Sequence, residues 1–289
     1  MDSFEQKVER TIAQLQHEGV QSIAAGITRN RMAWLDRTLP GKPGYAGYTP
    51  REVYELLFFE NMGLERSELP VVSESPDRIV WLSTNRCPLL EACVRLGLDT
   101  RRVCRPANEK ATQAFVSRIN PQLRFHRSYE EIRPHTAYCR EWIARVDFAA
   151  CMRVAIGEAR CSRVAGYAAH GAVVVLDNRI IGRAHDTSAV ERDPSRHAAA
   201  QAIDQAAQVT GDADLCGAIL FSTAEPCPLC ASRAARANLT TIVYGVAAEE
   251  LAGLGRAPTA ISAGEIIARS GCAIEVIGGV LHDECRALS

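Results

Sequence analysis

Apolar positions in the first half of the chain recur first with the spacing of a helix and then with that of strands. From residue 3 to about residue 27 they lie three or four positions apart, which predicts a helix. Thr49 is followed by Pro50 and Glu52, a capping sequence that predicts a second helix to about Asn61. Three further segments are predicted strands: 77–83, 123–129 and 136–143. Residues 1–145 therefore form a predicted α+β domain.

The pattern changes near Val146. A helix rich in alanine and arginine leads into two apolar runs joined by Asp177-Asn178, which predicts a β-hairpin, and Asp193-Pro194 predicts the start of a helix. The predicted elements are a helix at 147–163, strands at 171–176 and 179–184, a helix at 195–209, a strand at 217–221, a helix at 231–237, a strand at 241–246, a helix at 262–270 and a strand at 273–277. After the hairpin, every strand is separated from the next by a helix. This order predicts parallel crossovers in a three-layer α/β/α sandwich over residues 146–289.

Composition narrows the class of partner. The 289 residues are 47% hydrophobic and 23% charged, with 33 basic and 34 acidic side chains interspersed. This balance is typical of a globular protein with a substantial core. It lacks the basic footprint of a protein that binds nucleic acid, so a small-molecule substrate is the expected partner.

The distribution of apolar residues and cysteines indicates a cytoplasmic protein. The N-terminal residues do not form a secretory signal, and no window holds eighteen apolar residues, so we expect no membrane span. Eleven cysteines, an odd number, are scattered along the chain. They suit reduced thiols and a metal site in the cytoplasm better than a disulfide framework.

Cys227 and Cys230 are the first candidates for chemistry. They lie between an apolar strand and a helix, so both fall on one face of the first helical turn, where free N–H groups and the helix dipole stabilise thiolates. Such a pair serves either as zinc ligands or as a redox dithiol.

His197 favours zinc. It follows Asp193-Pro194 at the beginning of the preceding predicted helix, and crossover helices of a parallel sheet begin at the same sheet edge. Topology therefore brings His197 to Cys227 and Cys230. Three protein ligands with one open position are typical of a catalytic zinc site.

The segment from Gly171 to about Gly245 resembles the zinc-dependent superfamily of cytidine, deoxycytidylate, guanine and tRNA-adenosine deaminases. The matching residues are Asp193-Pro-Ser-Arg-His197 and Thr223-Ala-Glu-Pro-Cys-Pro-Leu-Cys230, which correspond to the superfamily's H-x-E and P-C-x-x-C sequences. The resemblance implies a cytidine-deaminase-like fold, bound Zn²⁺, hydrolytic release of ammonia from a nucleobase-like or other small amino-heterocycle, and a homo-oligomer. Because a helix separates the last two strands, it favours the guanine, tRNA-adenosine and deoxycytidylate branch.

One position departs from the family. Its proton-carrying glutamate stands two residues after the histidine, where this chain has Ala199. Alanine cannot take a proton from water or deliver one to the leaving amine. Because the metal-binding sequence is otherwise intact, we interpret Ala199 as a deliberate inactivating substitution. The alternative is natural loss of activity, which would leave a deaminase-like zinc-binding interaction or regulatory module.

Asp186 is the candidate for substrate binding. It stands where guanine and tRNA-adenosine deaminases usually place an asparagine that contacts the base. An ionised aspartate only accepts hydrogen bonds, so it would favour a substrate with N–H donors; the alternative is a solvated loop residue.

The N-terminal half weakly resembles the L-2-amino-thiazoline-4-carboxylic acid hydrolase family, through Asn85-Arg-Cys87-Pro-Leu-Leu-Glu, Val103-Cys104 and Tyr138-Cys139. The resemblance implies that Cys87, Cys104 and Cys139 cluster as a second site with His126 or His135. The alternative is separate core thiols.

Overall fold

The computed structural model describes residues 2–39, 47–164, 169–254, 260–272 and 274–288, and contacts divide the chain into two units, Met1–Val146 and Asp147–Ser289. Each unit has its own sheet and its own hydrophobic core. None of the helices in the described part of the chain is long and apolar enough to cross a bilayer.

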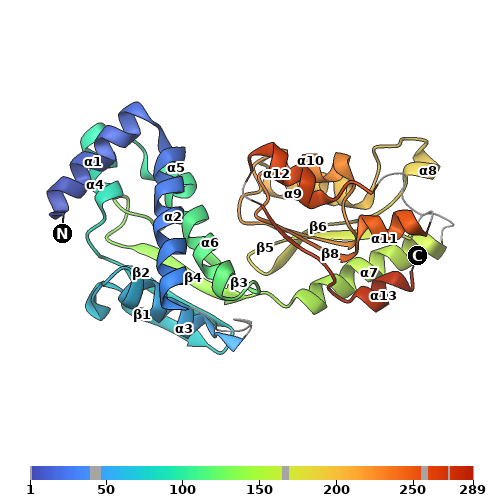
Figure 1. Cartoon of the computed structure of the whole chain (residues 1–289), viewed down its shortest axis with the longest axis horizontal. Coiled ribbons are helices and arrows are strands. Elements are labelled where there is room, and N and C mark those ends of the chain that lie inside the picture. The colour runs from blue at the N-terminus through green and yellow to red at the C-terminus, as the bar shows by residue number, and fades with distance from the viewer. Residues whose placement is uncertain (1, 40–46, 165–168, 255–259, 273, 289) are drawn as a thin grey trace. The chain divides into compact units, whose positions relative to one another are not determined.

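The N-terminal unit places helices against one four-stranded sheet (Figure 1). Its elements are the helices α1 (Phe4–His17), α2 (Val20–Thr38), α3 (Pro50–Glu55), η2 (Leu56–Asn61), η3 (Arg66–Glu68), α4 (Pro88–Leu96), α5 (Thr100–Cys104), η4 (Arg105–Glu109) and α6 (Lys110–Ile119), and the strands β1 (Val71–Ser75), β2 (Arg78–Ser83), β3 (Leu123–Arg127) and β4 (Cys139–Arg145).

The sheet of this unit has the order β1-β2-β4-β3, and every pairing is antiparallel. Trp81, Phe125 and Ile143 are buried on the sheet face that packs against helical residues such as Tyr54 and Phe115. The sheet thus gives one face to a core that the helices close, as expected for an α+β domain.

Two predictions for this unit need correction, and one strand was missed. The helix predicted over 3–27 is two helices, broken at Gly19, whose φ of 81° lies in the region that favours glycine. The strand predicted at 136–143 is β4, shifted toward the C-terminus. Strand β1 was not predicted, because it is an edge strand that is mostly exposed and so lacks an apolar alternation.

The C-terminal unit is built around one five-stranded sheet. Its elements are the helices α7 (Phe148–Val164), α8 (Ser188–Glu191), α9 (Ala198–Thr210), α10 (Pro228–Arg236), α11 (Ala248–Gly253), α12 (Ala263–Ser270) and α13 (His282–Arg286), and the strands β5 (Gly171–Leu176), β6 (Arg179–His185), β7 (Ile219–Ala224), β8 (Thr241–Val246) and β9 (Glu275–Ile277). Part of the predicted strand 273–277 lies outside the described residues, since Ala273 is not described.

The sheet order is β6-β5-β7-β8-β9. Strand β5 is antiparallel to both of its neighbours, β6 and β7, so β6 and β7 run in the same direction on either side of it. Strands β7, β8 and β9 are mutually parallel. Helices α9, α10 and α12 lie on one face of the sheet, and α7 and α13 lie on the other (Figure 1). The predicted three-layer sandwich and the parallel last pair of strands are confirmed.

Local geometry explains the position of α9 against β6. The Asp177-Asn178 turn has both residues at positive φ, 51° and 60°, as a two-residue hairpin turn requires. Gly182 in β6 lies so close to α9 that a Cβ there would be 2.1 Å from the Ala202 carbonyl oxygen. A glycine facing alanine lets the helix backbone pack directly on the strand.

The predicted start of this helix was wrong. Asp193 does not cap it; its Oδ1 accepts hydrogen bonds from the N–H and hydroxyl of Ser195 in a local turn. The helix begins at Ala198, with His197 as its N-cap residue. An aspartate followed by proline forms such a turn as readily as it forms a cap, so the sequence alone did not distinguish them.

Candidate metal centre

Two strand-to-helix junctions form the site. Strand β6 leads through α8 to His197, the N-cap residue of α9, and β7 leads to Cys227, the N-cap residue of α10. Because β6 and β7 are parallel, both junctions lie at the same edge of the sheet. The Gln201 side-chain amide donates to the carbonyl oxygens of His185 and Arg196 at 2.9 and 2.7 Å, which ties the segment before His197 to α9.

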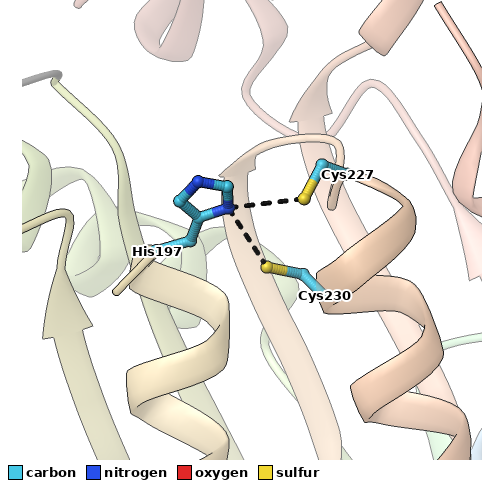
Figure 2. Close-up of side chains that lie close together, drawn as sticks. All are labelled: His197, Cys227 and Cys230. Atoms are coloured by element: carbon cyan, nitrogen blue, oxygen red, sulfur yellow. Dashed lines mark hydrogen bonds between the residues drawn. The ribbon is translucent and has the colours of Figure 1, made fainter. Parts of the chain in front are cut away.

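The three predicted ligands converge (Figure 2). His197 Nδ1 lies 3.3 Å from the Cys227 sulfur and 3.6 Å from the Cys230 sulfur. The ligand atoms all lie within 4.8 Å of one another, and in the described part of the chain this is the one such group of histidine, cysteine or acidic residues. Cys230 is buried, while His197 and Cys227 are half-buried.

The three side chains are electrostatically coupled. Hydrogen bonds from the Cys230 thiol and from His197 lower the pKa of Cys227. The same contact with Cys227 raises the pKa of His197, and the hydrogen bond to Cys227 together with burial raises that of Cys230. A metal ion bound here would displace the protons that these three groups share.

The donor set fits zinc. One imidazole nitrogen and two sulfurs are borderline-soft ligands of the kind that Zn²⁺ binds in tetrahedral sites. Both sulfurs lie at the N-terminal end of α10, where the helix dipole stabilises negative charge. The described residues supply three such ligands, one fewer than a closed tetrahedral site needs.

Ala199 lies in the first turn of α9 and is 4% exposed. It belongs to the core cluster that also contains Ala198, Ala202 and Cys230. Its methyl group packs in the core at this position and cannot exchange protons.

Asp186 follows β6 directly and is 5% exposed. Its Oδ1 accepts hydrogen bonds from the Ser188 N–H at 3.0 Å and from the Ser188 hydroxyl at 2.6 Å. Its negative charge contributes to raising the pKa of His197, so it acts electrostatically on the centre. A solvated loop aspartate would be exposed, so this alternative is wrong; contact with a substrate stays a prediction.

Two residues near the centre were not predicted. His170 precedes β5, and its pKa is lowered, chiefly by burial. The charges of Asp186 and Cys227 raise this pKa, and the charge of His197 lowers it. Glu225 is buried and accepts from the N–H groups of Ala248 and Ala263, both at 2.8 Å, so it holds the starts of α11 and α12. The position of Glu225 two residues before Cys227 was the signal available in the sequence.

The N-terminal thiols cluster, but without a histidine. Cys87, Cys104 and Cys139, joined by Cys93, line one cavity of about 30 Å³, and neither His126 nor His135 is among its lining residues. The Cys104 sulfur accepts a hydrogen bond from Arg127. The three thiols therefore share a cavity, the predicted histidine is not found there, and a second site at this place stays a prediction.

Comparison with known proteins points to deaminases for the C-terminal unit. The MafB19-like deaminase family matches residues 146–276. A tRNA-specific adenosine deaminase of Bacillus subtilis is 34% identical over 134 residues, which cover 46% of this chain and 81% of that protein. A tRNA(Ile)-lysidine synthase of Deinococcus deserti is 39% identical over 105 residues, 36% of this chain but 20% of that protein.

Two solved structures are also similar. One comes from work on A-to-I editing by tRNA:A34 deaminases; it is 27% identical, with a TM-score of 0.43, and the match covers 48% of this chain and 99% of that one. The other is guanine deaminase from Bacillus subtilis, 28% identical with a TM-score of 0.38, covering 39% of this chain and 72% of that one.

Proposed function

This chain belongs, through its C-terminal unit, to the cytidine deaminase superfamily, and we propose that the unit is built as a zinc-dependent aminohydrolase for a nucleobase-like or other small amino-heterocycle. The observation that carries the proposal is the convergence of His197, Cys227 and Cys230 at the starts of α9 and α10. A redox dithiol would not require a histidine at this distance.

His197, Cys227 and Cys230 would hold the zinc. When bound, zinc supplies a Lewis acid that brings the pKa of water to about 7 and so provides a nucleophile at neutral pH. The residues of this chain fix the ligand geometry: Gln201 holds the segment before His197, and the first turn of α10 fixes the two thiols relative to each other.

Asp186 would orient the substrate. Its Oδ1 is held by Ser188, and none of the described residues donates a hydrogen bond to its Oδ2. A carboxylate oxygen without a donor accepts an N–H of an amino-heterocycle. The aspartate thereby selects rings that present N–H groups at this edge.

Ala199 would prevent turnover by this chain. The superfamily reaction needs a group that moves a proton from water to the leaving amine, and the first turn of α9 presents a methyl group there. We propose that the residue replaced by Ala199 is glutamate and that the substitution is an engineered inactivation. The codon in the natural source tests this directly: glutamate supports the proposal and alanine contradicts it.

Restoring the carboxylate is the decisive experiment. Ala199→Glu is expected to raise ammonia release from at least one of guanine, 2,6-diaminopurine, adenosine and cytidine by about 10²–10⁴-fold, the usual contribution of a positioned acid–base group. The matched control is Ala199→Gln, which has the same size but carries no exchangeable acid and should stay at background. Equal, background rates in both variants across the panel would contradict the proposal.

A second candidate function follows from Ala199 itself. A chain that keeps its metal ligands and lacks the proton carrier could serve as a zinc-binding interaction or regulatory module. In that case Ala199→Glu would bind zinc as the parent does but release no ammonia. Metal content and ammonia release together therefore separate the two functions.

The salt dependence of tRNA binding tests the kind of substrate. Because the charges are balanced, 33 basic against 34 acidic, we propose a free heterocycle and not a nucleic acid as the substrate. Several relatives are named as tRNA-specific deaminases, so tRNA is the appropriate comparison. Tight binding of tRNA that weakens steeply between 50 and 200 mM salt, about the range over which phosphate contacts are lost, would contradict the proposal.

We also propose a reducing, cytoplasmic setting and a homodimer. All eleven cysteines are present as free thiols, and metal binding requires the Cys227 and Cys230 sulfurs in that form. Light scattering on the purified chain measures the oligomeric state, and a monomer across the micromolar range would contradict the dimer.

A further inference from the structure

His170 lies at the edge of the C-terminal sheet where the candidate metal centre forms. It directly precedes β5, which is antiparallel to β6 and β7, so the start of β5 lies beside the ends of those two strands. The Asp186 N–H donates to the His170 carbonyl oxygen at 3.0 Å, and the Gly171 N–H donates to the Thr223 hydroxyl at 3.1 Å. The backbone of His170 is therefore held between the ends of the two strands that lead to the predicted metal ligands.

Strand alternation determines the direction of the His170 side chain, because successive residues of a strand point to opposite faces of the sheet. A Cβ at Gly171 would lie 2.0 Å from the Ala155 carbonyl oxygen, so position 171 faces α7. Ala172 lies on the other face, in the core cluster that contains Cys230. Position 170 is two residues from Ala172, so the imidazole is on the face that carries α9 and α10 (Figure 1).

Asp186 faces the same side. Gly171 pairs with His185 in the register of β5 and β6, so His170 lies opposite Asp186, and opposite residues of an antiparallel pair share a face. His185 points the other way, since its Nδ1 lies 3.4 Å from a Glu158 carboxylate oxygen of α7. His170 and Asp186 thus form a neighbouring pair directed toward the helices that carry the predicted metal ligands.

The imidazole of His170 is available to a ligand. The side chain is half-buried, and among the described residues none forms a hydrogen bond with either of its ring nitrogens. The charges of Asp186, His197 and Cys227 all affect its pKa, as expected of a ring beside them. An imidazole presents at least one N–H donor in either protonation state, whereas an ionised aspartate only accepts. The pair therefore offers one donor and one acceptor at neighbouring positions.

We propose that His170 contacts the substrate, donating a hydrogen bond to a ring carbonyl oxygen next to the ring N–H that Asp186 accepts. This donor and acceptor match the adjacent C=O and N–H groups of a lactam. A site built to make such hydrogen bonds discriminates against rings that lack the matching groups. The role of His170 rests on the proposed aminohydrolase function and narrows its substrates to amino-heterocycles that contain a lactam.

Two pairs of ligands test this selection. Guanine and cytosine are amino-heterocycles with a lactam, and 2-aminopurine and 4-aminopyrimidine are their counterparts without one. Because the zinc-loaded Ala199 chain should bind such ligands without turnover, calorimetry measures each dissociation constant directly. We expect the lactam member of at least one pair to bind at least about tenfold more tightly, the effect of one to two hydrogen bonds.

The variants assign the preference to His170. His170→Leu, which keeps the bulk and lacks the N–H donor, should weaken binding of the lactam member by about five- to tenfold and leave its counterpart within about twofold. His170→Gln restores a donor and should restore most of the affinity. His185→Leu is the matched control, because His185 lies on the neighbouring strand but faces α7, and it should change neither affinity.

Equal affinities within both pairs, or a preference that survives in His170→Leu, would overturn the role of His170 and leave the proposed function intact. If none of the four ligands binds the zinc-loaded chain, the centre takes no nucleobase-like ring, so the proposed function fails and the role of His170 fails with it. Circular dichroism establishes that His170→Leu is folded. His170→Ala, which removes the ring without adding bulk, is measured in parallel and should lose the same preference.

Discussion

At the scale of single residues, the candidate metal centre depends on three side chains with unequal burial. Cys230 is 2% exposed and packs in the alanine-rich core, whereas His197 and Cys227 are half-buried. The buried thiol anchors the centre to the core, and the other two form its open side. Substitutions should therefore differ in their effect on stability although all three affect the metal.

We predict one zinc ion per chain, and less than about a tenth of that in His197→Ala, Cys227→Ser and Cys230→Ser, since a site with three protein ligands does not tolerate the loss of one. Elemental analysis after dialysis measures the content. Cys272→Ser is the control, because Cys272 contacts the same core cluster but lies outside the ligand group. Full zinc content in any ligand variant would contradict the assignment.

The pH at which the thiols react follows from their surroundings. In metal-free protein Cys227, whose pKa is lowered by Cys230 and His197, is deprotonated at lower pH than an ordinary thiol. It should be alkylated by iodoacetamide at about pH 6.5, some two units below the usual thiol pKa. Cys285, whose pKa burial raises to about 12, should not react.

Added zinc should abolish the reaction of Cys227 at this pH and leave other thiols unchanged. Mass spectrometry of the tryptic peptides reads both sites in one sample. Alkylation of Cys227 that begins only near the pKa of a free cysteine would show that the contact with Cys230 and His197 does not persist in solution.

At the scale of elements, the position of His197 depends on how closely α9 packs against β6. Gly182→Ala would place a methyl carbon 2.1 Å from the Ala202 carbonyl oxygen, so α9 must move away from the strand. We predict a loss of about 1–3 kcal/mol in the free energy of unfolding, as for other overpacked sites, together with weaker zinc binding. Chemical denaturation and zinc competition with a chelator measure the two effects.

Gly157→Ala is the matched control. Gly157 lies in α7, and a Cβ there meets nothing within 4 Å. The substitution should stabilise the helix by about 0.5–1 kcal/mol and leave zinc affinity unchanged. If Gly182→Ala behaved like Gly157→Ala, the close contact between β6 and α9 would not be what positions His197.

The elements of the C-terminal unit were more predictable from the sequence than those of the N-terminal unit. Its strands are buried apolar runs, its hairpin has a turn that few residues satisfy, and its helices end at residues such as Gly211. The N-terminal unit contains an exposed edge strand, β1, and a helix break at Gly19. The spacing of apolar residues reveals neither of them.

The candidate site was predictable to a similar degree. Cys227 and Cys230 are three positions apart in the sequence, and the crossover from β6 through α9 to the parallel strand β7 explains why His197 lies beside them. The role of Gln201, whose amide holds the carbonyl of Arg196, could not be predicted because it depends on how the segment before α9 folds back.

At the scale of the whole molecule, each unit has a core made from its own residues. The cluster around Cys230 contains residues from Ala172 to Val276, and the cluster around Trp81 contains residues from Met32 to Ile143. A domain with its own core can fold without the rest of the chain. We therefore propose that the two predicted domains, 1–145 and 146–289, are independent.

We predict that a fragment of residues 147–289 unfolds cooperatively and binds one zinc ion, whereas a fragment of residues 2–146 binds none. Asp147 caps the start of α7 by accepting from the Ala150 N–H, so the C-terminal fragment begins at a capped helix. Calorimetry and elemental analysis of both fragments provide the measurement. A fragment 147–289 that stays unfolded with zinc present would contradict independence.

The position of β5 between β6 and β7 also sets the time at which the metal centre can form. The β5–β6 hairpin is local and closes within about 1–10 μs, but β7 must pair with the opposite edge of β5 before the thiols reach His197. His197 and Cys227 are 30 residues apart, which a ribosome takes about 2–6 s to add. During synthesis His197 is therefore added before its two sulfur partners, and the three side chains can converge only after the crossover to β7.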